Sequence, residues 1–319
     1  LGFIISLCGA AAAGVALAYG NFSAYCAANI VCGTGTAFNN QIRFTAAENA
    51  GDEKPLVHSW VLMCGIVAAI IGPWIAVRGY QILPYGDYTG SLMMLSALLV
   101  FVILIATGLP KDHSGKVGAV EKNSSTTRNL RLVIKQSSFW LGAVAGMTSF
   151  ATMTLLMSAT PLQMHEMEHY SHAQTTFTIQ SHIVAMFLPS LFSGVLLSWL
   201  GVRKLIVLGT ALFFVCIPIA YVHHSFHHYW WALVLLGVGW NFLFLASSTI
   251  ISQAFSGPER FAAQGFNDVL VFGTQTVASL AAGSVLFAWG WQTLVLIPVP
   301  FLIGLLWVNG RVREKPKIA

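Results

Sequence analysis

Residues 205–258 read LIVLGTALFFVCIPIAYVHHSFHHYWWALVLLGVGWNFLFLASSTIISQAFSGP, and none of these 54 residues is Asp, Glu, Lys or Arg. A helix that crosses a bilayer needs about 20 consecutive, mainly apolar residues. The segment is long enough for two such helices, and the polar run from His223 to His228 divides it. This stretch therefore predicts two membrane-crossing helices that meet at an aqueous surface.

The composition of the whole chain supports that prediction. Of its 319 residues 56% are hydrophobic and only 8% are charged, and the mean hydropathy is +0.72. A soluble domain carries about 25% charged residues, so this chain could not cover a water-facing surface with polar side chains. We therefore exclude a cytosolic enzyme, a nucleic-acid binder and a disordered chain. The 5 cysteines lie in apolar stretches without a CxxC pair, which favours packing over disulfides or metal binding.

The other intervals without formal charge predict the remaining spans. Residues 1–42 and 269–310 each hold two helices, with breaks at Gly20-Asn21 and Gly290-Trp291. One helix is expected in each of four further intervals, which are 55–77, 88–110, 136–165 and 169–202. The sequence therefore predicts an all-α membrane protein with ten transmembrane helices, four before and six after a long polar segment.

That polar segment predicts the domain organisation. It contains six cations and the run Ser124-Ser125-Thr126-Thr127, a composition that suits a solvated linker. We expect an N-terminal helical bundle over residues 1–108, a cytoplasmic linker over 109–137 and a C-terminal six-helix bundle over 138–319.

The cations also predict the orientation in the membrane. With a cytoplasmic N-terminus, fifteen of the 16 Lys and Arg residues fall in cytoplasmic loops or at the C-terminal end, and only Arg78 does not. Cytoplasmic loops of membrane proteins carry an excess of Lys and Arg. Both termini of this chain are therefore expected on the cytoplasmic side, and a count wrong by one span would scramble the pattern.

Short motifs refine this picture. Residues 43–48 (RFTAAE) and 259–264 (ERFAAQ) occupy equivalent places in the two halves, and each precedes a helix punctuated by glycine. Residues 194–204 (GVLLSWLGVRK) form a basic loop motif without an acidic member, and residues 65–73 carry glycines and end in Gly-Pro. In these motifs and in its helix pattern the sequence resembles a bacterial transporter of the major facilitator superfamily. The resemblance implies six plus six helices, of which the first two are missing here.

The resemblance also implies a function. It predicts a secondary transporter in a bacterial inner membrane that moves a small organic solute by alternating access of two bundles. No enzymatic activity, cofactor, metal or nucleic acid is expected, and the partners are the solute, the lipid bilayer and, as a hypothesis, protons. We expect a monomer. A multidrug-like exporter, a non-transporting sensor and an inactive fragment are the alternatives.

Polar and thioether side chains inside the expected spans are the candidates for the lining of a substrate cavity. Polar groups are costly in hydrocarbon unless they face the bundle interior or water, and flexible thioethers suit an organic solute. The candidates are Thr148, Thr152, Met153, Met157, Thr160, Gln180, Trp240, Asn241 and Gln275. Ordinary helix packing explains many of the same residues, because small polar side chains are common at helix interfaces.

Titratable residues supply two further hypotheses. His182 is the candidate for proton coupling, because histidine titrates near neutral pH, and a hydrogen-bonded structural histidine is the alternative. Arg43, Arg260 and Asp268 are the candidates for a cytoplasmic gate. Asp268 is expected to open a helix, where the helix dipole alone would favour it. His165 and His169 have a spacing that could hold a metal, although a solvated loop is the preferred interpretation.

Overall fold

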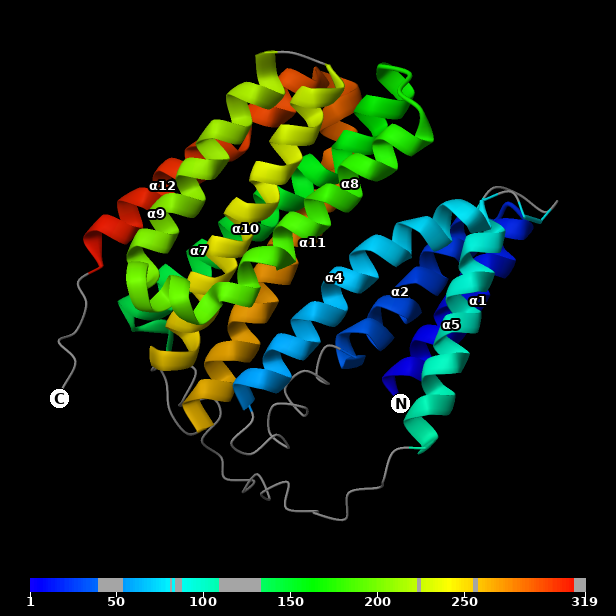
Figure 1. Cartoon of the computed structure of the whole chain (residues 1–319), viewed down its shortest axis with the longest axis horizontal. Coiled ribbons are helices and arrows are strands. Elements are labelled where there is room, and N and C mark those ends of the chain that lie inside the picture. The colour runs from blue at the N-terminus through cyan, green and yellow to red at the C-terminus, as the bar shows by residue number, and fades with distance from the viewer. Residues whose placement is uncertain are drawn as a thin grey trace. The chain divides into compact units, whose positions relative to one another are not determined.

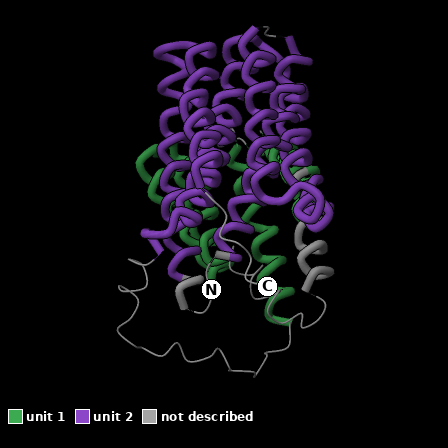
Figure 2. The backbone as a smooth tube through the Cα atoms, turned by 90° about the vertical axis from the view of Figure 1, so that its left-hand side faces the viewer, with its two compact units in different colours: residues 1–121 green, residues 122–319 purple. Residues whose placement is uncertain are grey.

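The computed structural model describes residues 1–39, 54–80, 82–83, 88–108, 133–222, 225–254 and 258–312. Every regular element in these ranges is a helix (Figure 1). The chain divides into two compact units, residues 1–121 and 122–319 (Figure 2). The division falls within the expected linker, most of which lies outside the described residues.

Unit 1 is built by close packing of small residues. Its described helices are α1 (Gly2–Ala18), α2 (Phe22–Asn39), α4 (Lys54–Gly79) and α5 (Thr89–Gly108). Helix α1 packs against α2 and α5, and α4 packs against α5. A Cβ atom added at Gly9 would collide with the backbone of Cys32, and one added at Gly35 would collide with Ser6. Small residues therefore allow the α1 and α2 backbones to approach, as is common between membrane helices.

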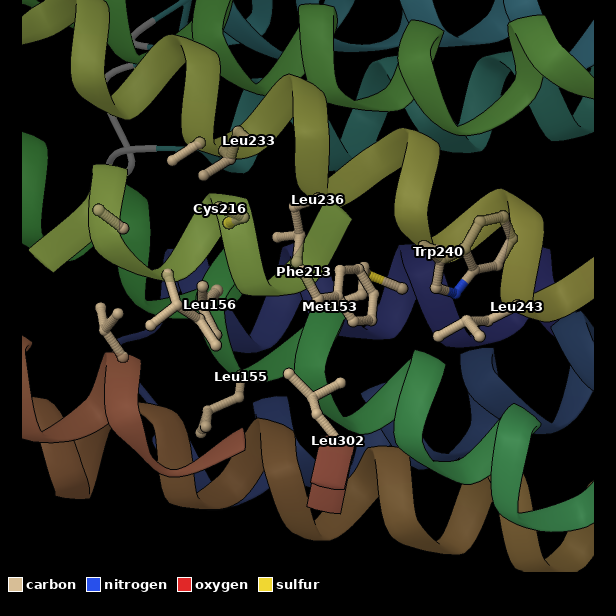
Figure 3. Packing of buried hydrophobic residues seen from close by; sticks show 14 of the residues in the cluster. Met153, Leu155, Leu156, Phe213, Cys216, Leu233, Leu236, Trp240, Leu243 and Leu302 are labelled. Atoms are coloured by element: carbon tan, nitrogen blue, oxygen red, sulfur yellow. The ribbon is translucent and has the colours of Figure 1, made fainter. Parts of the chain in front are cut away.

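Unit 2 holds the larger core. Its elements are α7 (Ser137–Pro161), η2 (Leu162–Met167), α8 (His172–Phe187), η3 (Leu188–Phe192), α9 (Ser193–Val222), α10 (Phe226–Ala254), α11 (Pro258–Leu296) and α12 (Pro298–Arg311). Helix α10 packs against α7, α8 and α9, and α7 also packs against α11 and α12. Figure 3 shows buried side chains between these helices, among them Leu233, Leu236, Trp240 and Leu243 of α10.

Glycine and serine set the spacing of the helices around α10. Gly209 of α9 faces Gly239 of α10, and a Cβ atom at Gly209 would lie 2.9 Å from the Gly239 carbonyl oxygen. On the α7 side, the Ser247 hydroxyl donates a hydrogen bond to the Gly142 carbonyl oxygen at 2.7 Å. The Ser149 hydroxyl donates to the Trp240 carbonyl oxygen at 3.1 Å. Helix α10 is thus held on two sides by close backbone approach and by hydrogen bonds to neighbouring backbones.

Proline and glycine explain where the long helices change course. Pro161 ends the α-helical part of α7, and a π-helix follows it, as expected where a proline disturbs the hydrogen-bond ladder. Pro189 lies in the 3₁₀ segment between α8 and α9. Gly201 (φ 68°, ψ 165°) and Gly290 (φ 80°, ψ 169°) break α9 and α11 into two helices each. Essentially only glycine adopts these backbone angles.

Several helical stretches are long and apolar enough to cross a membrane. The described residues contain five of them, which are Thr89–Gly108, Ser137–Met167, His172–Val222, Phe226–Gln253 and Ala262–Arg311. The third and fifth run for 51 and 50 residues and contain the breaks at Gly201 and Gly290. Gly2–Ala18 is apolar but shorter. The predicted total of ten transmembrane helices stays a prediction.

One expectation about a helix start is wrong. Asp268 was expected to open a helix, but α11 begins at Pro258 and Asp268 lies well inside it. Proline is favoured in the first turn of a helix because the first backbone N–H groups have no partner within the helix. The dipole at the helix start therefore does not explain Asp268.

Candidate functional site

The predicted cavity residues of α7 lie mostly inside the core of unit 2. Thr148, Thr152, Met153 and Thr160 are buried, and Met157 is half-buried against the same core. The Thr160 hydroxyl donates to a carbonyl oxygen of its own helix, that of Leu156, at 2.7 Å. Met153 and Met157 pack in the hydrophobic core of unit 2, and the role of the α7 residues as cavity lining stays a prediction.

The other predicted residues are distributed over α8, α10 and α11. Gln180 and Gln275 are half-buried, whereas Trp240 and Asn241 are buried. The Asn241 side-chain amide donates to the Met186 carbonyl oxygen at 2.6 Å and also to the Ser190 hydroxyl. Its Oδ1 atom is buried and has no hydrogen-bond partner among the described residues. Asn241 therefore ties α10 to the end of α8 and keeps one unused acceptor.

The structure places Trp240 in a group of aromatic rings from four helices. We call Phe150, Phe187, Trp240, Phe244 and Phe272 the ring cluster. Trp240 stacks on Phe244 with centroids 5.0 Å apart and planes 10° apart, and it meets Phe150 edge-on at 5.1 Å. Phe150 also contacts Phe244 and Phe272, each at 5.8 Å, and Phe187 lies 6.5 Å from Trp240.

The ring cluster runs from the core to an exposed position. Trp240 is 5% exposed, Phe150 and Phe244 are half-buried, and Phe272 is 43% exposed. The Trp240 Nε1–H group is buried and finds no acceptor among the described residues. A buried indole N–H usually has a hydrogen-bond partner. The cluster thus combines stacking surfaces with an unused donor.

Sequence reasoning selected Trp240 and missed the four phenylalanines. Trp240 and Phe244 are four residues apart, a spacing that places them on one helix face, so this pair was within reach of the sequence. The contacts of Phe150 and Phe272 depend on how α7 and α11 pack against each other and against α10. No local pattern could have brought these rings together.

His182 lies where the backbones of α8 and α10 are in close contact. It is fully buried, and its Nδ1 donates to the Leu233 carbonyl oxygen at 2.7 Å. A Cβ atom at Gly237 would lie 2.6 Å from the His182 carbonyl oxygen. With Nδ1 donating, Nε2 of the neutral ring is an acceptor, and it has no partner among the described residues. His182 therefore links the two helices, and its role in proton coupling stays a prediction.

Most of the residues predicted to form the cytoplasmic gate are outside the part of the chain that the structure describes. Arg43 and the side chain of Arg260 are not described. Asp268 is half-buried on α11, and the amide of Asn267 donates to its carboxylate at 3.5 Å. The pairing of these three residues as a cytoplasmic gate therefore stays a prediction.

The histidines between α7 and α8 are arranged differently from the predicted pair. The π-helix ends at Met167, and His169 has a positive φ of 55°, so it does not continue the helix that carries His165. Instead the rings of His165 and His172 lie 3.9 Å apart, and Nδ1 of His165 is 2.9 Å from the Tyr170 carbonyl oxygen. Within the described ranges, no group of three or more His, Cys, Asp or Glu side chains could hold a metal.

The basic loop motif is attached to the last helix. The Arg203 guanidinium donates to the Asn309 carbonyl oxygen at 2.9 Å, and the Asn309 amide donates to the Arg203 carbonyl oxygen at 3.4 Å. Arg203 follows the break at Gly201, so it fastens this turn to the end of α12. A backbone carbonyl accepts the hydrogen bond that an acidic side chain could have accepted.

Apolar helices of spanning length, grouped in two units, define an integral membrane protein that crosses the bilayer several times. The sequence model of the Major Facilitator Superfamily matches residues 1–240 and 145–319. The chain belongs to this superfamily and is a membrane transporter, which confirms the resemblance found in the sequence. No enzymatic activity is indicated.

Individual relatives agree with this assignment. The chain is 35% identical over 321 residues to the riboflavin transporter RfnT of Brucella anthropi, a match that covers 96% of this chain and 77% of RfnT. It is 24% identical over 347 residues to YddS, an uncharacterised transporter of Bacillus subtilis, covering 98% and 76%.

A solved structure shares the fold. FucP, a Major Facilitator Superfamily transporter in the outward conformation, aligns with a TM-score of 0.62 over 98% of this chain and 82% of its own. At 15% identity this match shows the fold alone.

Proposed function

We propose that this chain transports riboflavin, or a flavin of the same ring chemistry, across a bacterial inner membrane. The observation that carries the proposal is the 35% identity to a riboflavin transporter over 96% of this chain. Transport is secondary active and works by alternating access, in which two helical bundles move about a site between the two membrane faces.

The proposal includes a topology. The chain crosses the membrane ten times, with four crossings before the linker and six after it, and both termini lie in the cytoplasm. The turn at Gly20 and the breaks at Gly201 and Gly290 support this count. Fifteen of the 16 Lys and Arg residues then lie on the cytoplasmic side. The transporter acts as a monomer, and Arg43, Arg260 and Asp268 form its cytoplasmic gate.

Proton coupling through His182 belongs to the same proposal. Replacing His182→Gln removes the titrating ring and keeps an amide N–H that can donate to the Leu233 carbonyl oxygen, the partner of His182 at 2.7 Å. We expect the variant to fold and to transport at a rate independent of pH between about 5 and 8, the range in which histidine changes charge. Uptake measured at several pH values checks this. A pH profile like that of the wild type would remove His182 from the coupling mechanism.

Growth of a bacterial strain that neither makes nor imports riboflavin tests the proposed substrate. Expression of this chain should restore growth at low external riboflavin and should raise the cellular content of labelled riboflavin above that of the empty vector. A multidrug-like exporter would instead lower the cellular content and confer drug resistance. If protein is present in the membrane and uptake equals that of the empty vector, riboflavin import by this chain is excluded.

A further inference from the structure

The ring cluster has two properties that ordinary core packing does not require. Its rings contact one another edge-on from buried Trp240 through Phe150 to Phe272, which is 43% exposed. Phe150 connects the two ends, because it contacts both Trp240 and Phe272. Flat rings of a solute can stack against such side chains regardless of their detailed hydrogen bonding, because every aromatic ring has a π-face.

The second property is an unused donor on the buried ring of the cluster, next in sequence to a residue with an unused acceptor. Nε1–H of Trp240 is a donor and Oδ1 of Asn241 is an acceptor, and neither has a partner among the described residues. A buried polar group without a partner is unfavourable. A solute whose ring carries carbonyl oxygens and ring nitrogens would supply the acceptor that the indole lacks.

The charges around the cluster restrict the solute further. Helices α7, α8 and α10, which carry four of the five rings, contain no Asp, Glu, Lys or Arg. On α11, Asp268 precedes Phe272 by one helical turn. An anionic group such as a phosphate would find no cation on these three helices, and the charged residue nearest to Phe272 along α11 is acidic. Burying an unpaired charge is costly.

We propose that the ring cluster binds an uncharged, planar heteroaromatic ring, with the Trp240 N–H donating to an acceptor on that ring and Phe272 stacking at the outer end. The site rests on the proposed function, since the flavin ring system is flat, uncharged and rich in carbonyl oxygens and ring nitrogens. The proposed site places the bound ring of the solute in unit 2 and predicts that riboflavin binds more tightly than its phosphate ester.

Equilibrium binding to the purified full chain in lipid nanodiscs tests this site. The probes are riboflavin, riboflavin 5′-phosphate and lumiflavin, which has the same ring with a methyl group in place of the sugar-alcohol chain. Trp240→Phe keeps the ring and removes the donor, and we expect riboflavin affinity to fall about 5-fold, the worth of one hydrogen bond. Phe272→Ala removes a stacking surface, and we expect a loss of roughly 10-fold. Lumiflavin should lose affinity by the same factors, because these residues contact only the ring.

The matched control is Phe287→Ala. Phe287 lies on the same helix as Phe272, is 62% exposed and has no ring contact in the described structure. This variant should bind riboflavin as the wild type does. Thermal unfolding of each variant separates lost binding from lost folding, and Phe272→Ala at an exposed position is expected to fold even if Trp240→Phe does not.

The outcomes separate the site from the function. If the wild type binds riboflavin and the Trp240 and Phe272 variants bind it equally well, the ring cluster is not the site, and the proposed function stands. If riboflavin 5′-phosphate binds as tightly as riboflavin, the preference for an uncharged solute is wrong. If the wild type binds none of the three probes, both the site and riboflavin transport are overturned.

Discussion

At the scale of the residue, small polar side chains in unit 2 hold helices together through backbone carbonyl groups. Ser149 and Ser247 of the α7–α10 contact and His182 of the α8–α10 contact all donate to carbonyl oxygens of the neighbouring helix. A hydroxyl or imidazole N–H in a membrane helix must find an acceptor in protein, because lipid offers none. These residues are therefore explained by the fold before any role in transport is considered.

We predict that Ser247→Ala destabilises the protein by about 0.6 kcal/mol, the average for hydrogen bonds between membrane helices. The variant loses the 2.7 Å bond to the Gly142 carbonyl oxygen on α7. Ser248→Ala is the matched control, because the neighbouring serine is exposed and donates within its own helix to Phe244. Thermal unfolding in detergent measures both, and equal melting temperatures for the two variants would show that the bond between helices contributes nothing.

The candidate residues show what the sequence can and cannot predict about single side chains. Polarity inside an apolar span identified Thr148, Thr152 and Asn241, and all three are buried in unit 2. Polarity alone does not tell which neighbour satisfies the group, and Asn241 turned out to bond the end of α8. Phe244 shares a helix face with Trp240, but the other phenylalanines of the ring cluster carry no signal in the sequence, so only the packing of the helices reveals them.

At the scale of the element, the long helices are shaped by a few residues with restricted backbones. The charge-free intervals located the apolar helices, and the Gly290-Trp291 break lies where the sequence predicted it. The start of α11 was misplaced because Glu259 and Arg260 suggested a loop, whereas Pro258 begins the helix. Charged residues indicate which part of the chain lies outside the membrane. A helix can extend beyond the membrane surface, so the residue at which it begins depends on local backbone preferences such as that of proline.

We predict that Gly290→Ala destabilises the protein by about 1 to 3 kcal/mol, because a side chain at φ 80° and ψ 169° is strained. Gly283→Ala is the matched control on the same helix, since an added Cβ atom meets nothing within 4 Å at either glycine and only Gly290 has a positive φ. The control should be neutral or slightly stabilising, because alanine is the better helix former. Equal unfolding temperatures would mean that the kink tolerates a side chain.

At the scale of the whole molecule, the sequence predicts two helical bundles and an orientation that places its cations on one side of the membrane, and the orientation stays a prediction. Both depend on sums over many residues, and a single misjudged helix end does not alter them. The substrate is different, because it depends on a few side chains whose arrangement no periodicity encodes. The substrate proposed above therefore rests on the 35% identity to a riboflavin transporter and stays a proposal for this chain.

The orientation is tested by labelling single cysteines in intact cells, in a variant without the 5 native cysteines. A membrane-impermeant thiol reagent added outside should label Ser225→Cys and should not label Ser124→Cys, which lies in the cationic linker. After the membrane is permeabilised, both positions should react. If Ser124→Cys were labelled in intact cells as readily as Ser225→Cys, the two positions would not lie on opposite sides of the membrane. The proposed orientation and number of crossings would then be wrong.

The central claim is that this chain moves riboflavin across a membrane. Its most direct test is the purified chain in liposomes loaded with unlabelled riboflavin, which should exchange for labelled riboflavin added outside. We predict labelled riboflavin inside at levels well above those in liposomes without protein, and suppression of this signal by excess external riboflavin. Accumulation no greater than in protein-free liposomes, with the protein folded and inserted, would contradict the account.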